Sequence, residues 1–130
     1  MKQKTKIAGC RGAWARLKAN VYDFSDFLVK FGEINKLLLV EGAVTYHDPC
    51  HLVRGMGVSA QPRQLLAAIP GLELREMKDA DRCCGCAGTF SAVHYDLASK
   101  INDDKIANIK ATGAATVATG CSACRMFCSQ

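Results

Sequence analysis

The stretch "GAVTYHDPC", residues 42–50, sets the pattern for the whole fold. Its β-prone run from Ala43 to Tyr46 is stopped by Pro49, and a cysteine follows at once. Two further β-prone runs, Leu72 to Met77 and residues 114–119, are also followed by cysteines. The sequence therefore predicts three strands, each with a cysteine loop beyond its carboxyl end.

Two helical patterns separate these strands. Pro62 suits the first turn of a helix that ends near Pro70, and a longer helix is predicted from Ser91 to about Thr112, with Gly113 as its C-cap. The predicted buried face of the longer helix consists of Leu97, Ile101, Ile106 and Ile109. Alternating strands and helices predict an α/β fold: a small, mainly parallel sheet flanked by helices, with the cysteine loops gathered at the C-terminal ends of the strands.

Residues 12–31 carry apolar side chains at spacings of three and four, which predicts one helix with a buried face. That face would comprise Trp14, Leu17, Val21, Phe24, Leu28 and Phe31. With 130 residues, of which 49% are hydrophobic, the chain is large enough for one domain with a single core.

The charge and hydropathy of the chain argue against several classes of partner. The net charge of +5 is scattered and is not interleaved with aromatic residues, so we expect no nucleic-acid binding. The longest strictly apolar run, residues 37–40, is far below the roughly 20 residues of a membrane helix, and we expect no membrane insertion. The sequence shows no secretory signal, which predicts a reducing, cytoplasmic setting in which eight cysteines favour metal or redox chemistry over structural disulfides.

Five of the cysteines form a pattern typical of a metal centre: Cys50, the doublet Cys83 and Cys84, and the pair Cys121 and Cys124 in "CSAC". The two-residue spacing of the pair lets both thiolates reach one centre. Adjacent residues in extended backbone point to opposite sides, so the doublet chelates a single tetrahedral ion poorly but serves two metals of one cluster well. The pattern therefore favours a multi-iron centre over mononuclear zinc.

Gly85 and Gly88 fit the same interpretation, because glycines let the backbone turn closely around an inorganic cluster and direct N–H groups at its sulfides. Two alternatives stay open. In the first, the doublet forms a vicinal disulfide or two half-buried thiols. In the second, a closed zinc site uses Cys83, Cys84, Cys121 and Cys124.

Two cysteines and two histidines each have more than one candidate role. Cys86 and Cys128 are spare ligands, resolving thiols or small buried residues. His47 and His51 flank Cys50, where they can donate N–H bonds to cluster sulfur or relay protons, although a satisfied loop histidine is the more frequent case.

Three long stretches of this chain, residues 44–77, 83–91 ("CCGCAGTFS") and 101–114, resemble the cysteine-rich CCG domain. That domain is found in heterodisulfide reductase, in the glycolate oxidase iron-sulfur subunit, in anaerobic glycerol-3-phosphate dehydrogenase and in lactate-utilisation protein A. The family pattern, a Cys, then Cys-Cys-Gly, then Cys-x-x-Cys, covers residues 44–124. The resemblance implies a [4Fe–4S]-type centre, non-cubane in the heterodisulfide reductase members, carried here by Cys50, Cys83, Cys84, Cys121 and Cys124.

The resemblance further implies a function in electron transfer within larger oxidoreductases. We expect an iron-sulfur protein, or a non-catalytic subunit beside flavin or ferredoxin-like subunits, in a complex that acts on a hydroxy acid such as lactate or glycolate. No G-x-G-x-x-G or P-loop motif is present, so binding of NAD, FAD or ATP by those routes is not expected. The alternatives are a zinc-binding structural domain and a degenerate subunit-association domain without redox activity.

The chain departs from the family pattern at its start. Family members commonly carry two such domains in tandem, whereas this chain has one complete signature. "GCRGAW" parallels "GCSACR", with Cys10 matching Cys121 but Ala13 in place of the second cysteine. We therefore expect residues 1–40 to be a helical segment that resembles the tail of a missing first repeat, and residues 41–130 to be a single CCG domain without the usual C-terminal tail.

Overall fold

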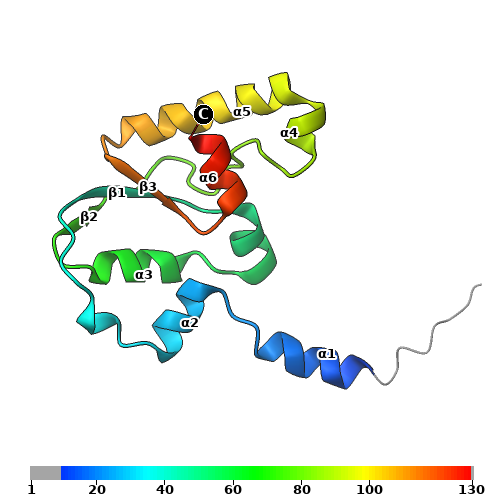
Figure 1. Cartoon of the computed structure of the whole chain (residues 1–130), viewed down its shortest axis with the longest axis vertical. Coiled ribbons are helices and arrows are strands. Elements are labelled where there is room, and N and C mark those ends of the chain that lie inside the picture. The colour runs from blue at the N-terminus through cyan, green and yellow to red at the C-terminus, as the bar shows by residue number, and fades with distance from the viewer. Residues whose placement is uncertain (1–9, 130) are drawn as a thin grey trace, which may run out of the picture.

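The centre of the molecule is a three-stranded sheet. The computed structural model describes residues 10–129, with side chains from residue 12 onward (Figure 1). The strands β1 (Gly42–His47), β2 (Leu72–Leu74) and β3 (Thr116–Thr119) stand in the order β2-β1-β3, and β1 pairs in parallel with both neighbours. The predicted α/β fold with a parallel sheet is confirmed.

The central strand β1 is buried from Val44 to His47, as expected for a parallel strand covered on both faces. His47, its last residue, pairs with Thr119, the last residue of β3. Because the strands are parallel, their carboxyl ends lie at one edge of the sheet. The chain runs from β1 to β2 and then returns past β1 to β3, so this edge contains a topological switch point between β1 and β3, the usual place for a ligand in such a sheet.

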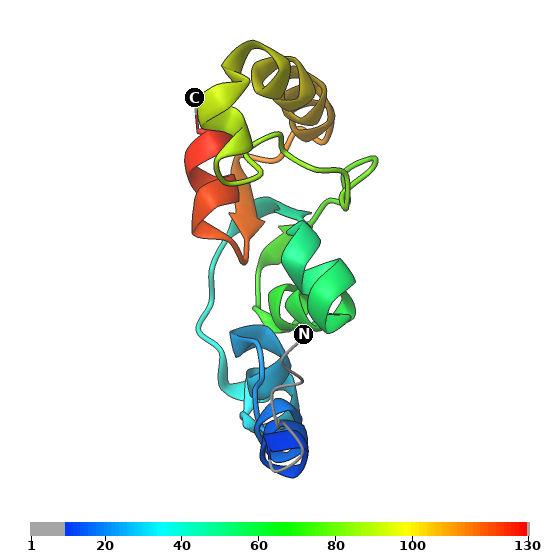
Figure 2. The same cartoon turned by 90° about the vertical axis from the view of Figure 1, so that its right-hand side faces the viewer.

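Helices cover the two faces of the sheet. α3 (Ala60–Ala68) lies on one face, and α5 (Tyr95–Ala111) and α6 (Ser122–Cys128) lie on the other, as the two views in Figures 1 and 2 show. Two short helices, η1 (Ile34–Lys36) and η2 (His51–Met56), flank β1 in the chain. Among the described residues, no helix is both long and apolar enough to cross a membrane.

The predicted helix from Ser91 to Thr112 is interrupted. His94, with φ −125° and ψ 52°, separates α4 (Phe90–Val93) from α5. The predicted buried face is also partly wrong, since Leu97 is 54% exposed and the buried residues of α5 are Ala98, Asn102, Lys105 and Ile109. The inward face carries an amide and an amine, and both donate to backbone carbonyl groups: Asn102 to Phe127 of α6, and Lys105 to Asp79 and Ala80. Gly113 has a φ of 64°, the left-handed conformation expected of a C-cap glycine.

The single helix predicted for residues 12–31 is wrong. The structure has α1 (Cys10–Ala19) and α2 (Phe24–Phe31), and α2 begins where the Asp23 carboxylate accepts a hydrogen bond from the Ser25 N–H. α2 packs against α3, while α1 extends away from the sheet (Figure 1). The predicted buried stripe is largely exposed, because no layer of the sheet lies under it: the exposed side chains are Trp14, Leu17, Val21, Phe24 and Phe31.

An arginine on α3 forms hydrogen bonds with residues of the loops that follow β1 and β2. Arg63 Nη1 and Nη2 donate to Asp48 Oδ1 and Oδ2 over 2.9 and 2.7 Å, and Nη2 also donates to Glu76 Oε2 over 3.1 Å. Hydrogen bonding to Asp48, and then to Glu76, raises the pKa of Arg63. Asp48 is only 4% exposed, so this two-pronged contact holds a buried carboxylate next to Cys50.

Replacing Arg63 with methionine leaves the buried Asp48 carboxylate without its partner. We expect Arg63→Met to lower the free energy of unfolding by about 2–4 kcal/mol, measured by urea denaturation of the whole chain. The matched control is Arg75→Met, which removes an exposed ion pair with Glu73 and an exposed hydrogen bond to the Gly113 carbonyl group, and it is expected to cost clearly less. Equal losses for the two variants would contradict the special role of Arg63.

Candidate metal centre

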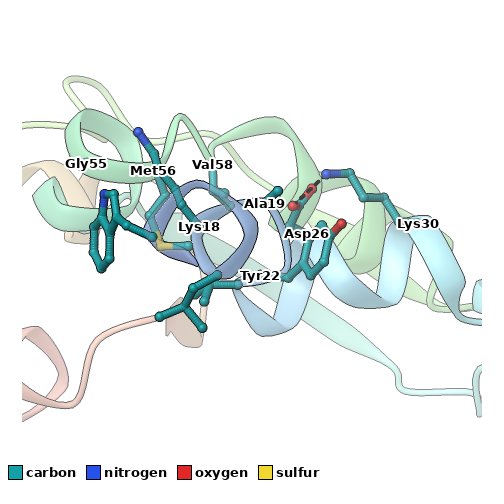
Figure 3. Close-up of a pocket in the computed structure, with 11 residues that line it drawn as sticks. Lys18, Ala19, Tyr22, Asp26, Lys30, Gly55, Met56 and Val58 are labelled. Carbon is teal, nitrogen blue, oxygen red and sulfur yellow. Dashed lines mark hydrogen bonds and ion pairs between the residues drawn. The ribbon is translucent and has the colours of Figure 1, made fainter. Parts of the chain in front are cut away.

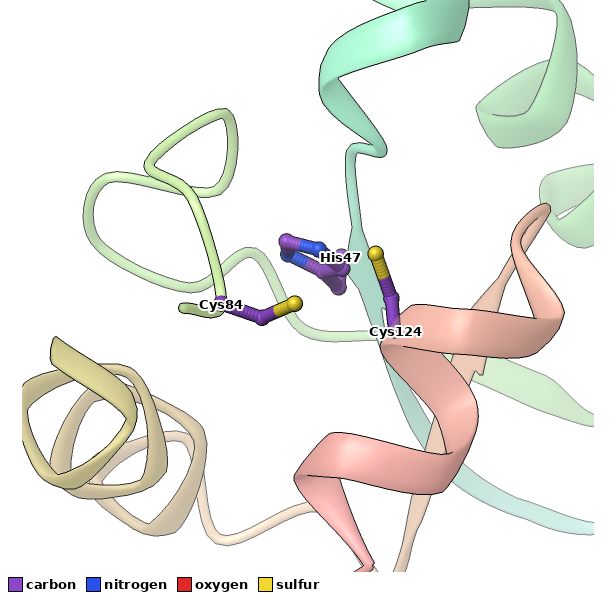
Figure 4. Close-up of side chains that lie close together, drawn as sticks. All are labelled: His47, Cys84 and Cys124. Atoms are coloured by element: carbon purple, nitrogen blue, oxygen red, sulfur yellow. The ribbon is translucent and has the colours of Figure 1, made fainter. Parts of the chain in front are cut away.

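Three buried side chains meet at the carboxyl edge of the sheet. His47 ends β1, Cys84 lies in the loop between β2 and α4, and Cys124 lies on α6, and one ligand atom of each is within 4.8 Å of the others. Figure 4 shows the three side chains pointing toward one another from these three segments. Their exposed fractions are 1%, 2% and 7%. Residues from three distant parts of the sequence therefore form one compact group.

The backbone conformation of the Cys-Cys-Gly loop explains how Cys84 reaches this group. Gly85 has a φ of 93°, and a Cβ atom there would lie 2.4 Å from the carbonyl oxygen of Ala98 on α5. Glycine is thus required both for the left-handed conformation and for the close approach of the loop to α5. Gly88 is also left-handed, with a φ of 61°, but a Cβ atom there would meet nothing within 4 Å.

The thiols of this region form a connected network around Cys84. Hydrogen bonds from the thiols of Cys124 and then Cys128 lower the pKa of Cys84 well below its usual range. The same interaction, together with burial, raises the pKa of Cys124 and of Cys128. A buried thiolate supported by neighbouring donors is the protonation state that a metal requires of its ligand.

The five predicted ligands do not all lie equally close to the compact group. Cys121 is half-buried and interacts with Cys124, and Cys83 is half-buried and accepts a 3.4 Å hydrogen bond from the Gly85 N–H. Cys50 is exposed and directly precedes η2. None of these three belongs to the compact group of described donor atoms around Cys84.

The described cysteines are all free thiols, so the vicinal disulfide between Cys83 and Cys84 is not formed in this structure. Cys86 is half-buried beside the same core, with its sulfur 3.9 Å from Ser91 Oγ. The side chain of Cys10 lies outside the described part of the chain.

His47, which belongs to the compact group, and Cys128, which packs beside it, were not among the five sequence-predicted ligands. His47 is not a satisfied loop histidine, because it ends a buried strand and both of its ring nitrogens are buried without a hydrogen-bond partner in the described part of the chain. Cys128 lies one helical turn after Cys124, so both face the same core. That i, i+4 spacing is the signal by which Cys128 was recognisable, and the position of His47 three residues before Cys50 is the local signal that marked His47.

The residues present fit an iron-sulfur or other thiophilic metal group. Buried polar atoms are normally hydrogen-bonded, and a buried imidazole without a partner loses stability unless another group occupies the space beside it. Cysteine sulfur and imidazole nitrogen are the donors that iron-sulfur centres and zinc use. The unpartnered imidazole beside two buried thiols is therefore the arrangement that such a group would complete.

A cavity of about 630 Å³ lies elsewhere, between α1, α2 and η2 (Figure 3). Its wall includes Trp14, Tyr22 and the ion pair of Asp26 with Lys30, in which the two atoms are 2.9 Å apart. The residues that line it include no cysteine or histidine, so it is separate from the candidate metal centre.

Comparison with known proteins agrees with this geometry. Residues 44–128 match the family described as the cysteine-rich domain, CCG. This chain belongs to the CCG family. The match begins in β1 and ends with α6, so it contains every element that contributes to the compact group. The resemblance inferred from the sequence is confirmed.

Individual relatives extend the comparison. The chain is 37% identical over 131 residues to a subunit of the fumarate reductase (CoM/CoB) of Methanothermobacter marburgensis, a match that covers 94% of this chain and 27% of the relative. It is 43% identical over 104 residues to a probable glycolate oxidase iron-sulfur subunit of Bacillus subtilis, covering 78% of this chain and 23% of the relative. It is 36% identical over 99 residues to lactate utilization protein A of Lysinibacillus sphaericus, covering 75% of this chain and 43% of the relative. The CCG chain thus spans less than half the length of each of these relatives.

The two loop glycines allow a matched test of how the site is built. We expect Gly88→Ala to cost about 1 kcal/mol, because alanine is strained in a left-handed conformation even in open space. Gly85→Ala adds a clash with the Ala98 carbonyl group and should cost clearly more, displacing Cys84 from the group. Thermal unfolding and the metal content of protein purified without oxygen are the measurements. A Gly85→Ala variant with the stability and metal content of Gly88→Ala would show that the close approach to α5 is not needed.

Proposed function

We propose that this chain is an iron-sulfur electron-transfer unit of a larger oxidoreductase. The observation that carries the proposal is the convergence of Cys84, Cys124 and the unpartnered His47 at the switch point of the sheet. The printed names of two relatives, a probable glycolate oxidase iron-sulfur subunit and lactate utilization protein A, support the same assignment. Membership of the CCG family connects the two lines of support.

The proposed ligands are the five cysteines of the family pattern: Cys50, Cys83, Cys84, Cys121 and Cys124. A [4Fe–4S]-type cluster would supply one-electron chemistry at this position. The chain itself supplies a buried thiolate at Cys84 and a loop whose N–H groups point at sulfur, as the Gly85 N–H does toward Cys83. Burial of Cys84 and Cys124 keeps water away from the centre, and such burial and N–H bonds tune a cluster's potential.

The exposed Cys50 adds a specific expectation. It follows Pro49 and precedes η2, so binding through it requires the start of η2 to turn toward the group around Cys84. Cys50 is therefore the proposed ligand that attaches last. Its replacement should weaken the cluster without preventing its assembly.

We place this unit beside flavin or ferredoxin-like subunits, in a complex that oxidises a hydroxy acid such as lactate or glycolate. The printed names of two relatives, a probable glycolate oxidase iron-sulfur subunit and lactate utilization protein A, support this setting. In this proposal CCG residues 41–130 form the electron-transfer domain, and the segment before them corresponds to the end of a preceding repeat.

A zinc-binding structural domain is the second candidate. The specific observation in its favour is that the compact group contains one imidazole and two thiols, a donor set that also suits a mononuclear tetrahedral ion. Zinc has no redox chemistry, so this candidate makes the chain a structural module.

Metal analysis decides between the two candidates. On protein purified without oxygen we expect about four irons and as many acid-labile sulfides per chain, with little zinc. Cys84→Ser and Cys124→Ser should abolish iron binding, Cys50→Ser should lower it, and Cys86→Ser, outside the family pattern, should leave it unchanged. One zinc per chain without sulfide would overturn the redox proposal in favour of the structural one.

A further inference from the structure

A cavity of about 240 Å³ lies between the sheet and the helices α5 and α6. His47 of β1 and two residues of β3, Val117 and Thr119, line its sheet side. His47 and Thr119 are register partners in the parallel sheet, and Val117 precedes Thr119 by two residues, so the three side chains lie on the same face. The register that brings His47 to the metal centre therefore also forms one wall of this cavity.

The helices form the opposite wall. Arg125 and Cys128 lie three residues apart on α6, and Ser129 is the C-cap of that helix, so one side of α6 borders the cavity. Ile109 of α5 adds an apolar side chain to the same wall. The cavity thus has an apolar part, from Ile109 and Val117, and a polar part at the ends of β1, β3 and α6.

This cavity adjoins the candidate metal centre but is separate from the sulfurs of the compact group. His47 belongs to both, whereas Cys84 and Cys124 do not line the cavity. An imidazole carries its two nitrogens at different positions of the ring, so one can serve the compact group while the other serves the cavity. A ligand in the cavity is therefore compatible with a metal at the compact group.

Buried polar atoms on the sheet side of the cavity have no partner. His47 is 1% exposed, and both of its ring nitrogens and Thr119 Oγ1 are buried without a hydrogen bond in the part of the chain that the structure describes. Buried polar groups are normally hydrogen-bonded, because leaving them unpaired costs stability. A ligand that accepts hydrogen bonds in the cavity would satisfy both side chains.

The charged side chain along the cavity is a cation. Arg125 lines the cavity, and no aspartate or glutamate does. Across residues 12–129 the ion pairs do not include Arg125, and its hydrogen bonds are made by its backbone groups. A guanidinium group presents its N–H donors as a planar fork that matches the two oxygens of a carboxylate. One cation without an acidic partner suits a ligand with one negative charge.

From this geometry we propose that the cavity binds the carboxylate group of a short monocarboxylic acid, with Arg125 as its charge partner, Thr119 and His47 as hydrogen-bond donors, and Ile109 and Val117 against its apolar tail. A volume of about 240 Å³ is below the roughly 300–1,000 Å³ of sites that hold drug-sized molecules, so the ligand is small. The inference goes beyond the proposed function and does not rest on it, because no cluster atom takes part in the binding.

The test is saturation-transfer NMR with sodium propionate, on the full chain purified without oxygen and at an ionic strength held constant with sodium chloride. We expect saturable binding with a dissociation constant on the order of 1 mM. Arg125→Gln removes the charge and should weaken binding about tenfold. The matched control is Arg54→Gln, which replaces an exposed arginine of η2 outside the cavity and should leave binding unchanged.

Thr119 offers a second matched pair of variants. Thr119→Val keeps the β-branched shape but removes the hydroxyl group, and it should weaken propionate binding about three- to tenfold. Thr119→Ser keeps the hydroxyl group and should bind propionate as the unmodified chain does. Equal affinity of the valine and serine variants would contradict a hydrogen bond from Thr119 to the ligand.

Inorganic phosphate tests the assigned chemistry of the ligand. It should displace propionate only weakly, and displacement at equal concentration would overturn the carboxylate assignment. Absence of saturable transfer, or equal losses in Arg125→Gln and Arg54→Gln, would overturn the site itself. Iron and sulfide analysis of the same samples decides the proposed function separately: a chain that holds iron but does not bind propionate refutes this inference alone.

Discussion

Parallel pairing of β1 with strands on both sides is the constraint from which the remaining features of this CCG chain follow. A parallel sheet directs all its carboxyl ends to one edge, so the segments after β1, β2 and β3 leave the sheet close together. That arrangement brings His47 and Cys124 together although they lie far apart in the sequence. It also leaves β1 covered on both faces, which is why His47 is buried at all.

The faces that enclose this edge are more polar than an ordinary core. α5 turns Asn102 and Lys105 inward, and both donate to backbone carbonyl groups of neighbouring segments, Asn102 to Phe127 over 2.9 Å. Such bonds are directional, so they fix where the loop and α6 stand relative to α5 more sharply than apolar contacts do. These buried polar side chains therefore fix the positions of neighbouring segments and add little hydrophobic stabilisation.

The sequence predicted the features that depend on local chemistry and on strand order. Alternating strand and helix patterns, stop signals such as Pro49 and the left-handed Gly113 were sufficient to define a parallel α/β fold with cysteine loops at one edge. The sequence did not predict which face of each helix packs against the rest of the molecule. Leu97 has the spacing of a buried residue but faces outward, because α5 turns its polar side toward the site.

The same limit explains the errors at the site and at the N-terminal segment. The helical spacing of the apolar residues in 12–31 predicts a buried stripe. That spacing does not show whether another element of the fold packs against the stripe. The importance of His47 arises from the register of β1 with β3, which no spacing within the sequence reveals. The role of Cys121 and Cys124 as a ligand pair was predicted from the sequence, because that prediction depends only on their two-residue spacing.

The contacts of Arg63 have a kinetic consequence for the proposed electron transfer. Through one guanidinium group, Arg63 binds Asp48 and Glu76 and so connects the loops that follow β1 and β2. Loops connected in this way would hold the proposed cluster ligands close to one geometry, which is the support that a functional site needs. In the proposed function, ligands held in this way would favour a low reorganisation energy and therefore fast electron transfer at a small driving force.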